Sequence, residues 1–204
     1  MNRFLHRSVL LTIVFSWLIL WGCASTPPTR FYTLSPLPGS DKPGGSGSDQ
    51  CVSIGIGPVR IPAYLEQIKI MTYLNQNEYM VGEYSRWSEP LEANISRTLA
   101  ANLTSLLCTK NVSIFPWKGS VPLDYRVYVE IVRMDGSLGE SAVLDAFWTI
   151  FDGAEKRKLL LVKQTHYKET PGDKKGYEAY VSAQSRNLGA LSRDIAEAIK
   201  NLPR

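Results

Sequence analysis

The stretch "DYRVYVEIVRM", residues 124–134, alternates apolar and polar side chains regularly along its length. The apolar set is Val127, Val129 and Ile131, and the alternating set is Arg126, Tyr128 and Glu130. Successive side chains of a β-strand point to opposite faces of its sheet. This stretch therefore predicts a strand with one face in the protein core and the other face at the surface.

Seven further segments carry the β-favouring residues of a strand and are bounded by turn residues. They are residues 31–34, 52–56, 68–73, 78–83, 112–115, 141–151 and 158–168. The third and fourth flank "NQN" and predict a hairpin. The last two are joined at Asp152-Gly153, a strong hairpin-turn signal.

Two amphipathic helices complete the pattern. The first has Ser88 as the expected N-cap, Pro90 in its first turn and an expected end near Leu107. The second spans about residues 177–201, with Leu, Ile and polar residues on opposite sides. The predicted order along the chain is strands, a helix, four strands and a second helix. This order predicts a single α+β domain: a mostly antiparallel sheet with two main helices packed on one face.

The N-terminus differs from the rest of the chain. Arg3 and Arg7 form a basic start, residues 9–21 are almost entirely apolar, and no acidic residue precedes Asp41. A membrane-spanning helix needs roughly 20 apolar residues, so this run has the length of a signal-peptide core instead.

The end of the apolar run, Leu20-Trp21-Gly22-Cys23, resembles a bacterial lipobox, although Trp21 is bulkier than usual. An ordinary signal peptide with an incidental cysteine is the alternative. The lipobox reading makes residues 1–22 a lipoprotein signal peptide, Cys23 the site of lipid attachment and residues 23–30 a tether. Residues 31–204 then form a periplasmic domain, with a flexible Gly/Ser/Pro-rich loop at 38–50. Ala24, by resemblance to sorted Gram-negative lipoproteins, implies the outer membrane.

Removal of residues 1–22 takes away two of the 23 basic residues and none of the 19 acidic ones, leaving a formal charge of +2. This balance argues against a nucleic-acid partner.

Two cysteines, Cys51 and Cys108, remain beside Cys23. Disulfides persist in exported proteins, so a bridge between the two is expected. Two buried free thiols are the alternative. The spacing is not that of a metal or dithiol redox site.

The chain offers little for catalysis. Beyond the signal segment there is one histidine, His166, and no motif of a hydrolase, a nucleotide-binding loop or a metalloprotease is present. We therefore expect no catalytic residues, no metal and no cofactor. Glu89 and Glu92 fit the negative charge favoured at a helix start, although an acid pair for glycoside chemistry stays open without coordinates.

Several segments together resemble the auxiliary lipoproteins of ABC-type transport systems, the family that includes paraquat-inducible protein C. They run nearly end to end: "LWGC", "RFYTLSP", "VSIGIGPVRIPAYLEQIKIMT", "YSRWSEPLEANISRTLAANL", "DYRVYVEIVRMDG" and "LSRDIAEAI". The resemblance implies an outer-membrane lipoprotein that works with an MCE-domain protein spanning the periplasm. Together they would move lipids, namely phospholipids, and support envelope integrity, with this chain as a docking or binding subunit. A structural lipoprotein of another envelope complex and an envelope hydrolase are the alternatives.

Aromatic side chains suggest where a protein partner would bind. Phe147 and Phe151 alternate with Trp148 and Ile150, so both faces of their strand are apolar over part of its length. An accessory that meets a symmetric MCE ring is expected to form a homo-oligomeric ring itself. The candidate interface residues are Trp117, Tyr128, Phe147 and Phe151.

Overall fold

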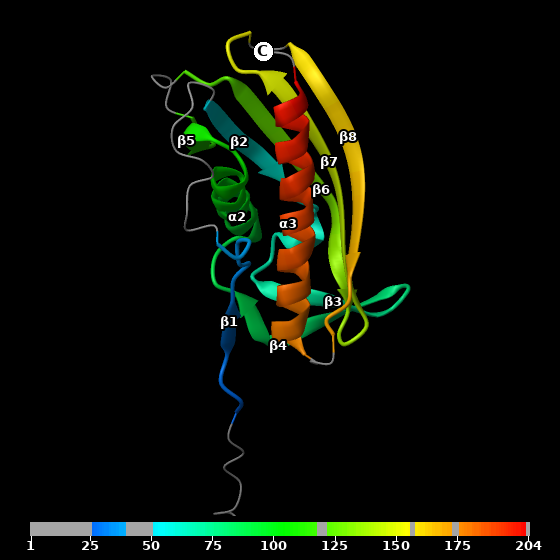
Figure 1. Ribbon diagram of the computed structural model, residues 1–204. Coiled ribbons are helices and arrows are strands. Elements are labelled where there is room, and N and C mark those ends of the chain that lie inside the picture. Colours follow the sequence, from blue (N-terminus) through cyan, green and yellow to red (C-terminus); the bar gives the residue numbers. More distant parts are fainter. Residues whose placement is uncertain (1–25, 40–50, 118–121, 156–157, 173–175, 203–204) are drawn as a thin grey trace, which may run out of the picture.

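The computed structural model describes residues 26–39, 51–117, 122–155, 158–172 and 176–202 (Figure 1). The lipobox with Cys23, the first part of the tether and most of the loop at 38–50 lie outside these ranges. The elements are β1 (Arg30–Tyr32), β2 (Val52–Arg60), η1 (Ala63–Leu65), β3 (Lys69–Asn75), β4 (Glu78–Trp87), α2 (Leu91–Leu106), β5 (Thr109–Ile114), β6 (Tyr125–Ser137), β7 (Ser141–Asp152), β8 (Leu159–Glu169) and α3 (Tyr177–Asn201).

A five-stranded sheet in the order β5-β2-β6-β7-β8 forms the main layer. Strand β6 alternates buried and more accessible residues, as its sequence predicts. The β6–β7 and β7–β8 pairings are antiparallel, whereas β2 pairs in parallel with both β5 and β6. The α+β class is confirmed, and the parallel pairings of β2 are a feature that the strand patterns did not predict.

The hairpin of β3 and β4 leaves the main sheet and forms a second, three-stranded sheet with β1. Strand β1 pairs in parallel with the end of β4, and the pairing continues as the Ser88 N–H donates to the carbonyl of Tyr32, 2.8 Å away. This bond holds Ser88 in an extended chain. The prediction of Ser88 as the N-cap of α2 is therefore wrong, because Pro90 occupies that position.

Both helices cover the same face of the main sheet (Figure 1). Helix α2 lies against β2 and β5, and α3 lies against β7 and β8. The core between them includes fully buried Ile54, Leu99, Trp148 and Leu188. The predicted packing of two main helices on one face of the sheet is confirmed.

Two local features join the strands at one end of the domain. Cys51 and Cys108, at the starts of β2 and β5, are bonded as a disulfide with Cα atoms 4.6 Å apart. Gly153 follows β7, and its N–H donates to the carbonyl of Asp124 at 2.9 Å. A Cβ at Gly153 would lie 1.8 Å from the carbonyl oxygen of Leu123, so only glycine fits this turn.

The described part of the tether leaves the domain at the end that holds β1, β4 and the first turn of α3 (Figure 1). The C-terminal end of α3 lies at the opposite end. Within the described ranges, no helix has the length and apolar character needed to span a membrane.

Candidate functional site

Aromatic side chains gather on the face of the main sheet that the helices leave uncovered. Trp117 follows β5, Tyr128 lies on β6, and Phe147 and Phe151 lie on β7. The ring centroids of Trp117 and Tyr128 are 6.0 Å apart, and those of Tyr128 and Phe151 are 4.9 Å apart. We call these four residues the aromatic face. They are the four that the sequence proposes as an interface.

Phe147 joins the aromatic face through a shallow pocket of about 220 Å³. The pocket is lined by Pro58, Arg60, Tyr128, Val129, Glu130, Phe147, Thr149 and Phe151. Phe147 is 41% exposed, a large accessible fraction for a phenylalanine side chain. An exposed group of aromatic side chains with a polar rim is typical of a protein-binding surface.

The backbone of Gly55 supports Trp117. A Cβ at Gly55 would lie 2.8 Å from the indole ring and 2.6 Å from Cδ1 of Leu123. Arg126 lies beside Gly55 in the sheet, and its guanidinium carbon is 5.6 Å from the centre of the Trp117 ring. Neither the indole Nε1 nor Nε of Arg126 has a hydrogen-bond acceptor among the described residues.

A second polar cluster lies where the two sheets meet, around the buried carboxylate of Asp135. Arg133 Nε donates to it at 2.6 Å, and the hydroxyl of Tyr64 donates to it at 3.3 Å. The Tyr79 hydroxyl lies 3.5 Å away and is also within 2.8 Å of the Tyr73 hydroxyl. Burial raises the pKa of Asp135, although the Arg133 contact opposes the shift. Burial, with the Asp135 charge, raises the pKa of Tyr64 to about 12.

The Tyr64 hydroxyl thus stays protonated at neutral pH and serves as a donor to Asp135. The cluster ties η1 and the small sheet to β6. This arrangement fits a structural junction, and nothing in the sequence of any one segment identifies it.

His166 is placed as a surface residue. Its side chain is largely exposed on β8, and Nδ1 bonds to the carboxylate of Asp145 on the neighbouring strand. Of the acid pair considered above, Glu89 forms an ion pair with Arg97 at 2.6 Å. Among the described residues, no three side chains of His, Cys, Asp or Glu are close enough to hold a metal ion.

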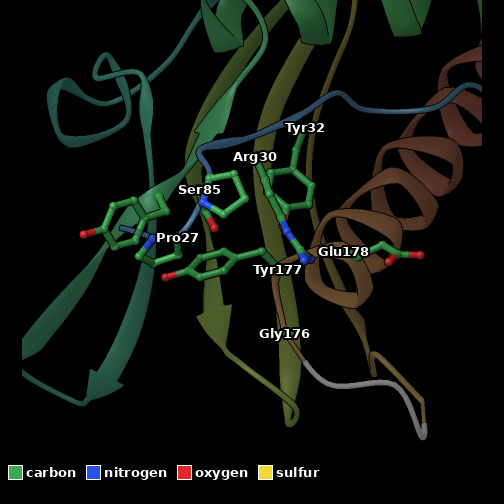
Figure 2. A pocket seen from close by; sticks show the side chains of 9 residues that line it. Pro27, Arg30, Tyr32, Ser85, Gly176, Tyr177 and Glu178 are labelled. Atoms are coloured by element: carbon green, nitrogen blue, oxygen red, sulfur yellow. The ribbon is translucent and has the colours of Figure 1, made fainter. Parts of the chain in front are cut away.

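A third feature, missed by the sequence analysis, is a pocket of about 370 Å³ where the tether meets the domain. Its lining comes from the tether, β1, β4 and the start of α3: Pro27, Pro28, Arg30, Tyr32, Tyr84, Ser85, Gly176, Tyr177 and Glu178. Figure 2 shows the Arg30 side chain reaching toward the first turn of α3, while the carboxylate of Glu178 points away. The tyrosine rings of Tyr32 and Tyr177 lie 6.3 Å apart, centre to centre.

Comparison with known proteins identifies relatives over nearly the whole chain. Residues 32–196 match the family described as "ABC-type transport auxiliary lipoprotein component". The intermembrane transport lipoprotein PqiC of Escherichia coli (strain K12) is 23% identical over 199 residues, covering 95% of this chain and 98% of PqiC. PqiC of Shigella flexneri matches to the same extent.

Two solved structures share the fold. The crystal structure of an uncharacterised protein aligns with a TM-score of 0.68 at 18% identity, over 85% of this chain and 99% of the other. A protein of Xanthomonas campestris aligns with a TM-score of 0.62 at 11% identity, over 82% and 93% of the two chains. At these identities the likeness concerns the fold alone.

Proposed function

Because this chain belongs to the family of ABC-type transport auxiliary lipoprotein components, we propose that it is an accessory subunit of a lipid transport system. It is anchored in the outer membrane through acylated Cys23 and faces the periplasm. It acts by binding other proteins and has no catalytic role. Its partner is an MCE-domain protein that spans the periplasm, and the lipids carried are phospholipids.

The aromatic face is the observation that carries a binding role. Tyr128 and Phe147 are exposed on adjacent strands, and Trp117 extends the surface over Gly55 of β2. Tyr, Trp, Phe and Arg are the side chains enriched at protein interfaces, and all four occur here. When such a face is buried against a protein, each Å² of apolar area removed from water stabilises the complex by roughly 25 cal/mol.

We propose the aromatic face as the contact between copies of this chain, so that copies close into a ring on which the MCE assembly ends. The position of the tether supports this arrangement. The tether leaves one end of the domain (Figure 1), and three of the four residues of the aromatic face lie on β6 and β7 of the main sheet. Copies anchored side by side in one membrane can therefore meet through this side without stretching their tethers.

The same geometry weighs against one of the two alternatives. A hydrolase built on His166 lacks support, because the His166 side chain lies largely exposed on the surface of β8. A lipoprotein of another envelope machine could form the same ring and bind a different partner. The identity of the partner recovered from cells therefore separates it from the leading proposal.

Membrane fractionation tests the anchor. We expect the wild-type chain to sediment with the outer membrane and a Cys23→Ala variant to leave that fraction. Light scattering of the purified lipoprotein in detergent tests the ring. We expect a mass of several chains for wild type and of one chain for Phe147→Glu. A wild-type monomer at high concentration would refute the ring and leave the anchor untouched.

A further inference from the structure

We propose that the pocket between the tether and the start of α3, with Arg30 and Tyr84 in its lining, binds a phosphate-ester anion such as the headgroup of a phospholipid. The inference rests on the proposed function, because the anchor and the transported lipids define which membrane and which ligand are near.

The cation of the pocket has no partner among the described residues. Arg97, Arg133 and Arg186 each hold a carboxylate. By contrast, Arg30 makes no side-chain hydrogen bond or ion pair with any other described residue. Guanidinium groups recognise phosphate through charge-assisted, often bidentate hydrogen bonds. Arg30 therefore holds a charge that the described part of the chain leaves without a counter-ion.

The other polar groups of the lining are suited to an anion. Tyr84 and Ser85 contribute hydroxyl groups, and the first turn of α3 has backbone N–H groups without intrahelical acceptors. The one carboxylate of the lining, that of Glu178, is exposed and points away from Arg30 (Figure 2). The side of the pocket that Arg30 reaches thus presents donors, and phosphate oxygens accept from donors.

The size and shape of the pocket also fit a headgroup. Its volume of about 370 Å³ is at the lower end of the range for small-molecule pockets, roughly 300–1,000 Å³. The ring of Tyr177 forms a fixed wall, because it lies directly over Gly82. A Cβ at Gly82 would approach its Cζ and Oη to 3.0 Å.

The pocket lies close to the lipid anchor, so the membrane is the nearest source of ligand. Arg30 lies seven positions after Cys23, and a fully extended chain of that length spans about 24 Å at most. In the lipid-anchored protein, Arg30 is therefore held within about 24 Å of the membrane surface, close to the headgroups of surrounding lipids.

The test is calorimetric titration of the full lipidated protein in non-ionic detergent with three probes. They are dihexanoyl phosphatidylglycerol, dihexanoylglycerol, which lacks the phosphate, and glycerol 3-phosphate, which lacks the acyl chains. We expect the first to bind and the second not to bind. Arg30→Gln should weaken binding by about 10-fold or more, as for loss of one charge-assisted hydrogen bond, while Arg30→Lys retains most of it. Tyr84→Phe, which removes only a hydroxyl, should weaken it several-fold.

Arg193→Gln is the matched control, because Arg193 is an exposed arginine of α3 outside the pocket. If glycerol 3-phosphate binds as tightly as the lipid, the pocket recognises the phosphate group alone, and the ligand can be a soluble phosphate ester. Absence of binding by both phosphate probes, or equal affinities in Arg30→Gln and Arg193→Gln, would overturn the proposal. These titrations need no protein partner, so their failure is distinct from failure to recover an MCE-domain protein.

Discussion

The hydroxyl of Tyr64 donates to the carboxylate of Asp135 at 3.3 Å, across 71 positions of sequence, and so joins η1 to the C-terminal end of β6. The contact lies at the junction of the two sheets, where Tyr64 and Tyr79 also stack with ring centres 5.1 Å apart. It explains how a hairpin that has left the main sheet is still held against it.

Asp135→Asn tests this junction through pH. Burial raises the pKa of folded Asp135 above its ordinary value of 3.8, so between these two pKa values the folded chain binds the extra proton. The resulting stabilisation is complete below pH 3.8 and is lost as the pH rises through the folded pKa. Between pH 3.8 and the folded pKa, we expect the free energy of unfolding of wild type to fall relative to that of the variant. Above the folded pKa, the difference between the two free energies should stay constant. Urea unfolding from pH 4 to 8 measures the difference, and a rise of wild type relative to Asp135→Asn would contradict the account.

Gly55→Ala tests the support of the aromatic face. The new methyl group would lie 2.8 Å from the indole of Trp117 and 2.6 Å from Leu123, so one of these must move. Overpacking of this kind costs about 1–3 kcal/mol. In a Trp117→Ala background we expect a smaller penalty, because one of the two neighbours is gone. A double-mutant cycle from denaturant unfolding gives the coupling, and simple additivity would show that Trp117 does not lie over Gly55.

Asn102→Ala tests how the segment after β1 is fastened to the helices. The Leu37 N–H donates to Asn102 Oδ1 at 2.7 Å, and Asn102 Nδ2 donates to the Ser192 hydroxyl at 2.9 Å. Loss of both bonds from a fully buried side chain should cost about 1–3 kcal/mol and speed hydrogen exchange at the Leu37 amide. Asn77→Ala, at an exposed turn, should change neither quantity. Unchanged exchange at Leu37 in the Asn102 variant would contradict the fastening role.

Cys51→Ser tests the disulfide. The bridge closes a separation of 57 residues, for which the chain-entropy model gives a stabilisation of about 4 kcal/mol. We expect the variant and reduced wild type to unfold at the same lower denaturant concentration. If adding reductant does not lower the denaturant concentration at which wild type unfolds, the bridge is refuted.

The sequence predicted the elements well where burial follows a regular period. The stripe of Leu188, Leu191 and Ile195 places the last helix at residues 177–201, and α3 has these bounds. The alternation of residues 124–134 likewise becomes the central strand β6. Each pattern is set by neighbours in the sequence, so it can be recognised without the fold.

Pairings between distant segments were not predictable in this way. Nothing within residues 52–60 shows that β2 inserts between β5 and β6, because the residues of one strand do not identify its neighbours. The separate sheet of β1, β3 and β4 depends in the same way on contacts across the fold. Alternation did place Phe147 and Phe151 on one side of their strand, but the role of Gly55 beneath Trp117 required coordinates.

The tether pocket illustrates the same limit for a site. Its lining combines residues near positions 27, 84 and 177, and no segment among them carries a recognisable ligand motif. That Arg30 has no partner among the described residues becomes visible only in the structure.

Recovery of a partner from cells tests the central claim most directly. The lipidated, tagged chain is cross-linked in its native host and purified, alongside Phe147→Glu and a control, Val81→Glu. Val81 is 43% exposed on β4 and Phe147 is 41% exposed on β7, so the two changes place a charge at equally accessible apolar sites. We predict that wild type and Val81→Glu recover an MCE-domain protein and that Phe147→Glu recovers much less. Wild type that recovers no MCE-domain protein would contradict the account.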